Sequence, residues 1–406
     1  GYIRKGHRQT DPARSYPARM ERRHHFAERK AHFNCTSRQS HRKEKTMNKP
    51  ATALYRLPYT DSPILIAQLQ GEPQILTSLQ ELNGRKGFVI APFRLTSSTP
   101  AVLIRPDLIA KGWDQIHEVL QCHPELKPGI ISCGNESVES SEPILKKAYE
   151  EAFGRFITPL RQGQFRKLVL SRSATYPLPQ DFSVMDAFIR ACKEYPRMMI
   201  SLHSTPFTGT WMGSTPEIIL SGNGRQWHTV ALAGTVPLIE GEENVTWSEK
   251  NRKEQALVTE YIREVISRFG TQSEEQGPYT ARAGRLLHLK TDFKFQIDNP
   301  ENIGNLLEAL HPTPAVCGLP KQEAYDFITA NEGYDRSYYA GVIGWTDPDG
   351  DTNLFVNLRC MQLTPHSAVL YAGGGLLPSS DPELEWNETL HKMATIKNTL
   401  TPNPRK

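Results

Sequence analysis

The stretch from Asn353 to Leu400 constrains the fold more than any other part of the chain, because two strand patterns lead through three glycines into a helix pattern. Apolar side chains recur at every second position of residues 354–359, which is the period of a pleated strand. Residues 369–372 form a second, shorter apolar run. We therefore expect two strands that deliver the chain to the start of a helix.

Gly373, Gly374 and Gly375 separate the second strand pattern from the helix. Glycine has no Cβ, so it lets the backbone turn tightly or approach a ligand closely. Ser380 or Asp381 can cap the helix by accepting hydrogen bonds from its first free amides. These residues predict a glycine turn followed by a capped helix.

The predicted helix places Glu385, Glu388 and Lys392 on one face, because they stand three and four residues apart. Two carboxylates one turn apart repel each other unless solvent or a cation lies between them. Beside a glycine loop they could hold Mg²⁺, a hard ion that prefers oxygen ligands. The spacing alone favours the simpler interpretation, a solvated helix face.

Charge is unevenly distributed along the 406 residues, of which 38% are hydrophobic. Residues 1–46 hold 13 Lys and Arg against 4 Asp and Glu, a balance of +9, so the net charge of +4 leaves −5 for the rest. An acidic body argues against a nucleic-acid surface. We expect residues 1–46 to be a disordered basic extension, not native if Met47 is the natural start, and residues 47–406 to form one domain.

Six cysteines lie far apart in the chain and form no CxxC pair. This spacing fits a reduced, cytoplasmic protein rather than a disulfide scaffold or a zinc site. No apolar run approaches the ~20 residues needed to span a bilayer, so we expect no membrane contact. Nothing in the sequence specifies the oligomeric state, and a monomer is the expectation.

Short alternating segments between residues 51 and 103 predict antiparallel strands. Amphipathic helices are predicted from Ser141 to about Gly163, from Ser183 to Tyr195, and from a capping box at Thr246 to Phe269. Runs of strands follow and precede these helices without βαβ alternation. The order predicts an α+β fold with mostly antiparallel strands.

The long helix carries Glu254 on its apolar stripe, three and four residues before Leu257 and Val258. A carboxylate on a core-facing stripe is costly to bury without a partner. It needs a cation, a hydrogen-bond donor or a cavity, unless it reaches solvent from the first turns of the helix. The sequence leaves these alternatives open.

Five motifs occur in consistent order and spacing in the last 240 residues or so, and a strand that begins at Lys167 precedes them. They are STPEIIL with ALAGT, LHPTPAVCGLPK, EGYDRSYYAGVIGW, NLRC and AGGGLLPSSDPELEWNETLHKM. Together they resemble the chorismate-utilising enzymes, a family that includes isochorismate, salicylate, anthranilate and aminodeoxychorismate synthases. Motifs in register are a specific signal, although the segment before about residue 140 matches only loosely.

The resemblance implies the fold of anthranilate synthase component I, in which two antiparallel sheets pack face to face with helices outside. It also implies chorismate as substrate and Mg²⁺ on the ring carboxylate of chorismate. By motif, Glu254 and Glu388 would be the metal ligands, with Glu385 in the ion's shell through water. Asn251 stands where many relatives have an acidic residue, which would weaken the outer shell.

Two positions indicate the branch of the family. Lys167 stands where water-using members carry a lysine, and Ala233 stands where aminodeoxychorismate synthases have a nucleophilic lysine. The resemblance implies that water attacks C2 of the ring while the C4 hydroxyl leaves. Lys167, neutral with a pKa lowered by burial, would take the proton from water, and Glu217 would protonate the leaving group. Taken alone, the two residues would pass as a strand-edge lysine and a turn carboxylate.

The resemblance also assigns substrate contacts. Arg359 and Tyr339 resemble residues that bind the pyruvyl carboxylate, and a guanidinium fork suits that group. Lys392 and the amides of Gly373–Gly375 would hold the other end of the substrate.

His288 matches a family histidine near the leaving hydroxyl, and Thr235 would support the residues that contact the substrate.

Salicylate synthases go on to eliminate pyruvate, and those members typically carry threonine where Ala315 stands. The resemblance therefore favours an isochorismate synthase, with menaquinone supply ahead of siderophore supply. The alternatives are a salicylate synthase, a non-catalytic binder of chorismate-like acids, or a nucleic-acid-associated protein that binds through residues 1–46.

Overall fold

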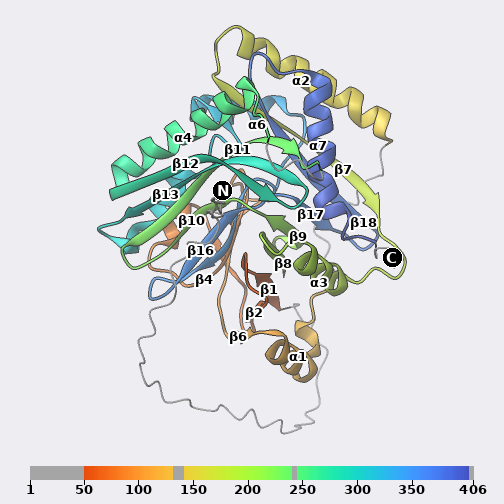
Figure 1. The fold of residues 1–406 in the computed structure, drawn as a ribbon. Helices are drawn as coiled ribbons and strands as arrows, with labels where there is room; N and C mark the ends of the chain where they lie inside the picture. The colour runs from red at the N-terminus through yellow and green to blue at the C-terminus, as the bar shows by residue number, and fades with distance from the viewer. Residues whose placement is uncertain (1–49, 131–140, 240–244, 402–406) are drawn as a thin grey trace, which may run out of the picture. The chain divides into compact units, whose positions relative to one another are not determined.

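Antiparallel strand pairing organises the chain. In the computed structural model, which describes residues 50–130, 141–239 and 245–401, the strands form two sheets of nine strands each (Figure 1). Every neighbouring pair within the two sheets runs antiparallel. The expected α+β class is confirmed, whereas the predicted extension 1–46 lies outside the described residues.

The two sheets have distinct strand orders. The first sheet runs β14 (Gly318–Leu319), β7 (Lys167–Pro177), β18 (Ser367–Leu376), β17 (Cys360–Leu363), β9 (Gly209–Thr215), β8 (Met199–Thr205), β1 (Ala51–Arg56), β2 (Ile64–Gln68) and β6 (Leu108–Lys111). The second runs β12 (Thr271–Ala283), β13 (Leu286–Gln296), β11 (Gln226–Pro237), β10 (Ile218–Asn223), β16 (Thr352–Val356), β15 (Val342–Thr346), β4 (Gly87–Ala91), β5 (Ala101–Ile104) and β3 (Gln74–Leu76).

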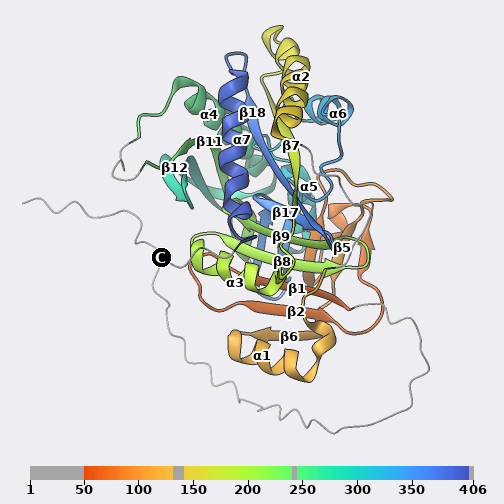
Figure 2. The same ribbon diagram turned by 90° about the vertical axis from the view of Figure 1, so that its right-hand side faces the viewer.

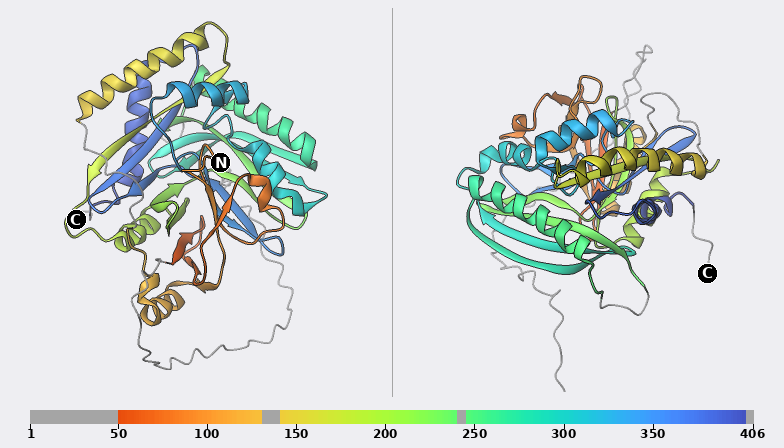
Figure 3. Two further views of the ribbon diagram at one scale, coloured as in Figure 1. Left: turned by 180° about the vertical axis from the view of Figure 1, so that it is seen from behind. Right: turned by 90° about the horizontal axis from the view of Figure 1, so that it is seen from above.

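Helices cover the sheets from outside (Figures 2 and 3). They are α1 (Trp113–Cys122), α2 (Glu142–Arg161), α3 (Val184–Glu194), α4 (Glu249–Phe269), α5 (Ile303–Leu310), α6 (Lys321–Asn331) and α7 (Pro382–Lys397), with short 3-10 turns at Leu79–Leu82, Pro124–Leu126 and Pro300–Asn302. None of these helices is long and apolar enough to cross a membrane.

The main hydrophobic core lies between the two sheets. Leu168 and Trp211 of the first sheet belong to the same buried cluster as Phe88 and Leu354 of the second. A second buried cluster joins the outer face of the first sheet to α1, α3 and α7. Apolar alternation along the strands therefore supplies both faces of the first sheet with core contacts.

Several helix starts agree with the sequence prediction. The Ser183 hydroxyl accepts from the Asp186 amide, and the Asp381 carboxylate accepts from the amides of Glu383 and Leu384. The predicted cap at Thr246 is wrong, because Ser248 caps α4 by accepting from the Asn251 amide. The cap lies two residues later than the capping-box pattern suggested.

The predicted glycine turn is also wrong. Gly373, Gly374 and Gly375 continue strand β18 and pair with residues 169–171 of β7. The strand is extended, not turned, and the missing Cβ atoms leave room for side chains of the protein itself. The sequence could not show this, because the approaching side chains come from α4 and α7.

A buried ion pair in the segment after α6 connects β7 to the segment before β14. The Arg336 guanidinium binds both carboxylate oxygens of Glu332 at 2.6 and 2.7 Å, and it also donates to the carbonyls of Val169 and Val316. Glu332 in turn accepts from the amide and hydroxyl of Ser171. Both Arg336 and Glu332 have side chains that are only 2% exposed.

Replacing Arg336 with methionine is expected to lower the free energy of unfolding by about 3–5 kcal/mol, because it leaves the Glu332 carboxylate buried without its cation. Equilibrium urea unfolding would measure the change. Arg263→Met is the matched control, since Arg263 grips Glu275 through two contacts of 2.9 Å but both side chains are partly exposed. The control should lower the free energy of unfolding by about 0–1 kcal/mol. An equal loss of stability in the two variants would contradict the claim that burial makes the Arg336–Glu332 pair more important than the exposed pair.

Candidate active site

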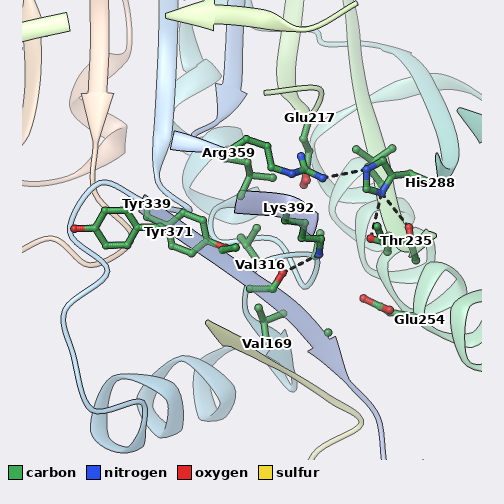
Figure 4. Close-up of a pocket in the computed structure, with 18 residues that line it drawn as sticks. Val169, Glu217, Thr235, Glu254, His288, Val316, Tyr339, Arg359, Tyr371 and Lys392 are labelled. Carbon is green, nitrogen blue, oxygen red and sulfur yellow. Dashed lines mark hydrogen bonds between the residues drawn. The ribbon is translucent and has the colours of Figure 1, made fainter. Parts of the chain in front are cut away.

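The predicted site residues converge where β7 and β18 of the first sheet meet β11 and β13 of the second (Figure 4). A pocket there is lined by ten of them: Glu217, Thr235, Glu254, His288, Ala315, Tyr339, Arg359, Gly373, Gly375 and Lys392. The other four, Lys167, Gly374, Glu385 and Glu388, lie next to the lining residues. Residues spread over more than 220 positions of the chain are thus brought together.

Arg359 presents two free donors to this pocket. The residue precedes β17 with a positive φ of 46°, and its side chain is buried. Nη2 contacts His288 Nε2 at 3.0 Å, whereas Nε and Nη1 are buried without a hydrogen-bond partner among the described residues. Burial lowers the pKa of the guanidinium from its usual value. An unpartnered buried guanidinium is costly, so the arrangement suits a carboxylate ligand that accepts from one of these free donors.

His288 is held as a neutral imidazole. Burial, together with the charges of Arg359 and Lys392, lowers its pKa well below the usual value. Nδ1 lies 3.0 Å from the carbonyl of Gly234 and 3.3 Å from the Thr235 hydroxyl. Since the carbonyl can only accept, the proton is on Nδ1, and Nε2 accepts from Arg359.

Glu217 is a buried carboxyl in the segment between β9 and β10. Burial raises its pKa to about 7, although Arg359, Lys167 and Lys392 act in the opposite direction. The side chain is 3% exposed, and the Thr313 hydroxyl faces it. At neutral pH a large fraction of this group is therefore protonated and able to donate a proton.

Lys167 opens β7 and has no exposed surface. Its Nζ lies 3.0 Å from Oε1 of Glu254, an ion pair without hydrogen-bond geometry, and it has no hydrogen-bond partner among the described residues. Glu254 points inward from α4 and is itself buried. This arrangement answers the question that the apolar stripe left open, because a cation faces the carboxylate.

The α7 carboxylates face the same region from the other side. Glu385 is 2% exposed, and burial raises its pKa to about 7, although the ammonium of Lys250 acts in the opposite direction. Lys250 and the Ser380 hydroxyl donate to Glu385 Oε1. Burial would raise the pKa of Glu388, but Lys392, at 2.6 Å, and Lys250 hold it below the usual value. The solvated helix face favoured by spacing alone is therefore wrong for Glu385, which is buried.

Gly374 and Gly375 leave the room that these carboxylates use. A Cβ on Gly375 would stand 2.0 Å from Glu254 Oε1 and 2.8 Å from Lys167 Cε. A Cβ on Gly374 would stand 3.0 Å from Glu385 Oε2. The strand backbone is thus the floor of a cradle between α4 and α7.

The cradle has the donor chemistry for a hard cation. Three carboxylates approach the glycine backbone, those of Glu385 and Glu388 at Gly374 and that of Glu254 at Gly375. Glu385 Oε2 is buried without a hydrogen-bond partner among the described residues. Within those residues, no three His, Cys, Asp or Glu side chains converge tightly enough to hold a metal ion as the structure stands. Lys167, Lys250 and Lys392 pair with the carboxylates instead. Carboxylate oxygens are the ligands that a hard divalent cation prefers.

The opposite wall of the pocket is aromatic. Tyr339 stacks on Tyr371 with ring centroids 5.6 Å apart and planes 13° apart, and Tyr371 stacks on Trp211. Burial raises the pKa of Tyr339, so its hydroxyl stays protonated. Ala315 lies on the pocket lining, and Lys392 Nζ donates to the Gly373 carbonyl at 2.7 Å. Aromatic faces and cations together suit a ring-containing acid.

The comparison with known proteins now identifies the family. Residues 88–401, more than three quarters of the chain, match the family described as chorismate binding enzyme. The chain belongs to the chorismate binding enzyme family. This membership confirms the resemblance that the five motifs carried.

Relatives within the family bear consistent names. The salicylate biosynthesis isochorismate synthase of Pseudomonas aeruginosa is 32% identical over 274 residues, which cover 63% of this chain and 55% of that protein. Isochorismate synthase EntC of Escherichia coli K12 is 34% identical over 200 residues, or 47% of this chain and 51% of that protein. The matched region thus spans about half the length of these relatives.

A solved relative shows the same fold. MenF, the menaquinone-specific isochorismate synthase from Escherichia coli, superposes with a TM-score of 0.70 at 19% identity, covering 88% of this chain and 90% of that chain. The predicted pair of packed antiparallel sheets with outer helices is confirmed.

Several residues of this site were missed by the sequence analysis. Val169 and Tyr371 lie two residues from Lys167 and Gly373, so strand alternation could have placed them on the same faces. Lys250 stands four residues before Glu254, one helical turn away. Its ammonium is held by carboxylates that raise its pKa although burial opposes its charge. Helical spacing could therefore have pointed to Lys250, but not to its partner on α7.

Proposed function

We propose that the chain is an isochorismate synthase, which converts chorismate to isochorismate by adding water at C2 and releasing the C4 hydroxyl. One observation carries the proposal: two unpartnered guanidinium nitrogens of Arg359 stand in a pocket with Glu217, a buried carboxyl whose pKa is raised to about 7. The first feature calls for a carboxylate ligand, and the second supplies an acid for a poor leaving group. The names of the relatives support the same reaction.

Each step falls to a residue of this chain. Arg359 binds a substrate carboxylate, and neutral His288 holds the guanidinium in place by accepting from Nη2. Lys167 in its neutral amine form takes a proton from the water whose oxygen bonds to C2, which gives the ammonium that pairs with Glu254. Glu217 gives its proton to the C4 hydroxyl, which leaves as water while the ring double bonds shift. One water enters and one leaves, so the reaction is an isomerisation.

The proposal includes Mg²⁺. Glu254 and Glu388 would hold the ion, with Glu385 reaching it through water, and a bound Mg²⁺ would neutralise the ring carboxylate of chorismate. The orphaned Oε2 of Glu385 and the glycine cradle support this ligand set. Asn251, buried at the start of α4, offers no charge to the outer shell.

The product is proposed to be isochorismate alone. Ala315 lies on the pocket lining where lyase-active members typically carry threonine, and Ala233 lies there in place of the nucleophilic lysine. Menaquinone supply is the proposed use of the product, with siderophore supply as the alternative. The solved relative is named menaquinone-specific, and another relative is named vibriobactin-specific. A monomeric, cytoplasmic enzyme remains the expectation, and light scattering on purified protein would test the first part.

The test is direct. The chain is incubated with chorismate, with and without Mg²⁺, and the products are separated by chromatography. Mg²⁺-dependent formation of isochorismate is the expected result. Enzymatic formation of salicylate and pyruvate would establish the salicylate synthase alternative. A folded protein that binds chorismate without turning it over would establish the binder.

Gly375→Ala is expected to lower kcat by about 10²-fold, because its Cβ displaces both Glu254 and Lys167, and misplacement of about 1 Å has effects of that size. The displaced atoms are the ends of flexible side chains, so the fold should persist. Initial rates and circular dichroism would measure the two effects. Gly154→Ala on α2, whose Cβ would meet nothing within 4 Å, is the control and should keep full activity. A Gly375→Ala enzyme with wild-type activity would show that the close approach of Glu254 and Lys167 to this strand is not needed for turnover.

A further inference from the structure

Gln255 is a buried side-chain amide between α4 and β11, and it is 1% exposed. Its Oε1 accepts from the Ala233 amide at 2.8 Å. Its Nε2 donates to the Ala231 carbonyl at 3.0 Å and to the Thr291 hydroxyl at 3.1 Å. Both ends of the amide therefore bind strands β11 and β13, immediately before one backbone irregularity in β11.

That irregularity is a bulge in β11 at Gly234. The pairing of β11 with β13 shifts register between Ala233 and Thr235, and Gly234 has a φ of +70°. A residue other than glycine would be strained there, and its Cβ would also stand 3.1 Å from Asn251 Cβ. Bulges re-aim backbone groups beside active sites. Here the Gly234 carbonyl leaves the ladder and accepts from His288 Nδ1 at 3.0 Å.

The carbonyl decides which nitrogen of His288 carries the proton. With the proton on Nδ1, Nε2 is free to accept from Arg359 Nη2. With the proton on Nε2, an N–H would face the guanidinium N–H, and a lone pair would face the Gly234 carbonyl. Only the first tautomer lets His288 anchor Arg359 through Nη2, while Nε and Nη1 stay without a partner among the described residues.

We propose that Gln255 is a positioning residue for Arg359: its amide holds the β11 bulge, and the Gly234 carbonyl then fixes the His288 tautomer that orients the guanidinium. The relay runs from α4 through the second sheet to the segment before β17 of the first. Its effect on chorismate binding rests on the proposed function, whereas the relay itself does not.

Gln255→Met tests the relay because methionine has a similar length and offers no amide. The Ala233 amide and the Ala231 carbonyl lose their partner, so the bulge can relax and the Gly234 carbonyl can turn away. Arg359 then binds the substrate carboxylate less well in both the ground state and the transition state. We expect KM for chorismate to rise about tenfold while kcat changes by less than about threefold.

A spectroscopic readout needs no substrate. In ¹⁵N-labelled protein, long-range ¹H–¹⁵N correlations distinguish the protonated from the unprotonated imidazole nitrogen, and comparison with His288→Gln identifies the signals of His288. The wild type should show the Nδ1–H tautomer alone. Gln255→Met should show a mixture of tautomers.

Two further variants keep the test decisive. Thr259→Val removes a polar group from α4 one turn later, where it touches Gln255 and Thr291 but not the bulge, and it should keep the wild-type tautomer and KM. Gly234→Ala acts on the bulge directly and should reproduce the mixed tautomer even if Gln255→Met does not fold.

The outcomes separate the two proposals. A single Nδ1–H tautomer in both Gln255→Met and Gly234→Ala would overturn the relay, whatever the enzyme does with chorismate. A mixed tautomer in a chain that never forms isochorismate would leave the relay standing and reject the proposed reaction. A rise in KM equal to that of Thr259→Val would show that Gln255 merely packs the helix on the sheet.

Discussion

Lys167→Met is expected to lower kcat by about 10²–10⁴-fold, the usual contribution of a positioned base. Water is a poor nucleophile, and Lys167 Nζ is a buried amine beside the pocket that lacks a hydrogen-bond partner among the described residues and lies 3.0 Å from Glu254. KM should change little, because Arg359 and Lys392 still bind the substrate. Initial rates of isochorismate formation would measure both constants.

Lys167→Arg separates a base from a simple positive charge. Arginine keeps the charge beside Glu254, but it does not release its proton in proteins. The arginine variant should therefore be as slow as the methionine variant. An arginine enzyme that retains more than about a tenth of the wild-type rate would assign Lys167 an electrostatic role and reject it as the base.

Stability must be controlled in the same experiment, because Lys167→Met leaves Glu254 buried without its cation. Lys321→Met is the matched control. Lys321 is also largely buried, and its ammonium binds the carbonyls of Glu308 and Ala309 at the end of α5, away from the pocket. The control should lose stability and keep kcat, which shows that a weakened fold does not by itself stop turnover.

Local patterns predicted the parts of the site that depend on neighbours in the chain. Asp381 could be predicted as the cap of α7, because its short side chain can accept from the first free amides and Pro382 is favoured at the first helical position. Glu254 could be placed on the inward face of α4 from its distance to Leu257 and Val258. Each of these inferences needs only the period of one helix.

Contacts between distant segments left no such signal. Lys250 and Glu385 are 135 residues apart, and Arg359 and His288 are 71 residues apart. The sequence favours a turn at the glycines of β18 because the side chains that need their missing Cβ atoms belong to the distant helices α4 and α7. The family resemblance predicted that most of these residues share one site. The contacts between their side chains are visible only in the structure.

Turnover is expected to fall as the pH rises through about 7, because Glu217 must be protonated to release the C4 hydroxyl. Burial raises the pKa of Glu217 to about 7, so the acid is present below that pH and is lost tenfold per pH unit well above it. The profile of kcat/KM against pH should therefore bend downward on the alkaline side. In Glu217→Gln the remaining activity should lack this bend, since an amide does not titrate in that range.

The Glu217 carboxyl should also make the free energy of unfolding depend on pH, whether or not the residue takes part in catalysis. Its pKa is raised from 4.5 to about 7 by folding, so the native state binds the proton more tightly than the unfolded state does. The stabilising contribution of the protonated group is complete below about pH 4.5 and is lost as the pH rises toward 7. At about 1.4 kcal/mol per unit, the loss is about 3 kcal/mol.

Urea unfolding at pH 5 and pH 8 would measure that loss as the difference between wild type and Glu217→Gln, because the other titrating groups are common to both. Wild type should lose more stability over this interval than the variant does. Suppose that wild type and Glu217→Gln lose the same stability between pH 5 and pH 8, and that the variant keeps the alkaline bend in kcat/KM. The catalytic acid must then be a different group. Glu385, whose pKa is also raised to about 7 by burial, is then the residue to test next. If both the bend and the stability difference disappear in Glu217→Gln, one buried carboxyl accounts for both, as general acid catalysis from this pocket requires.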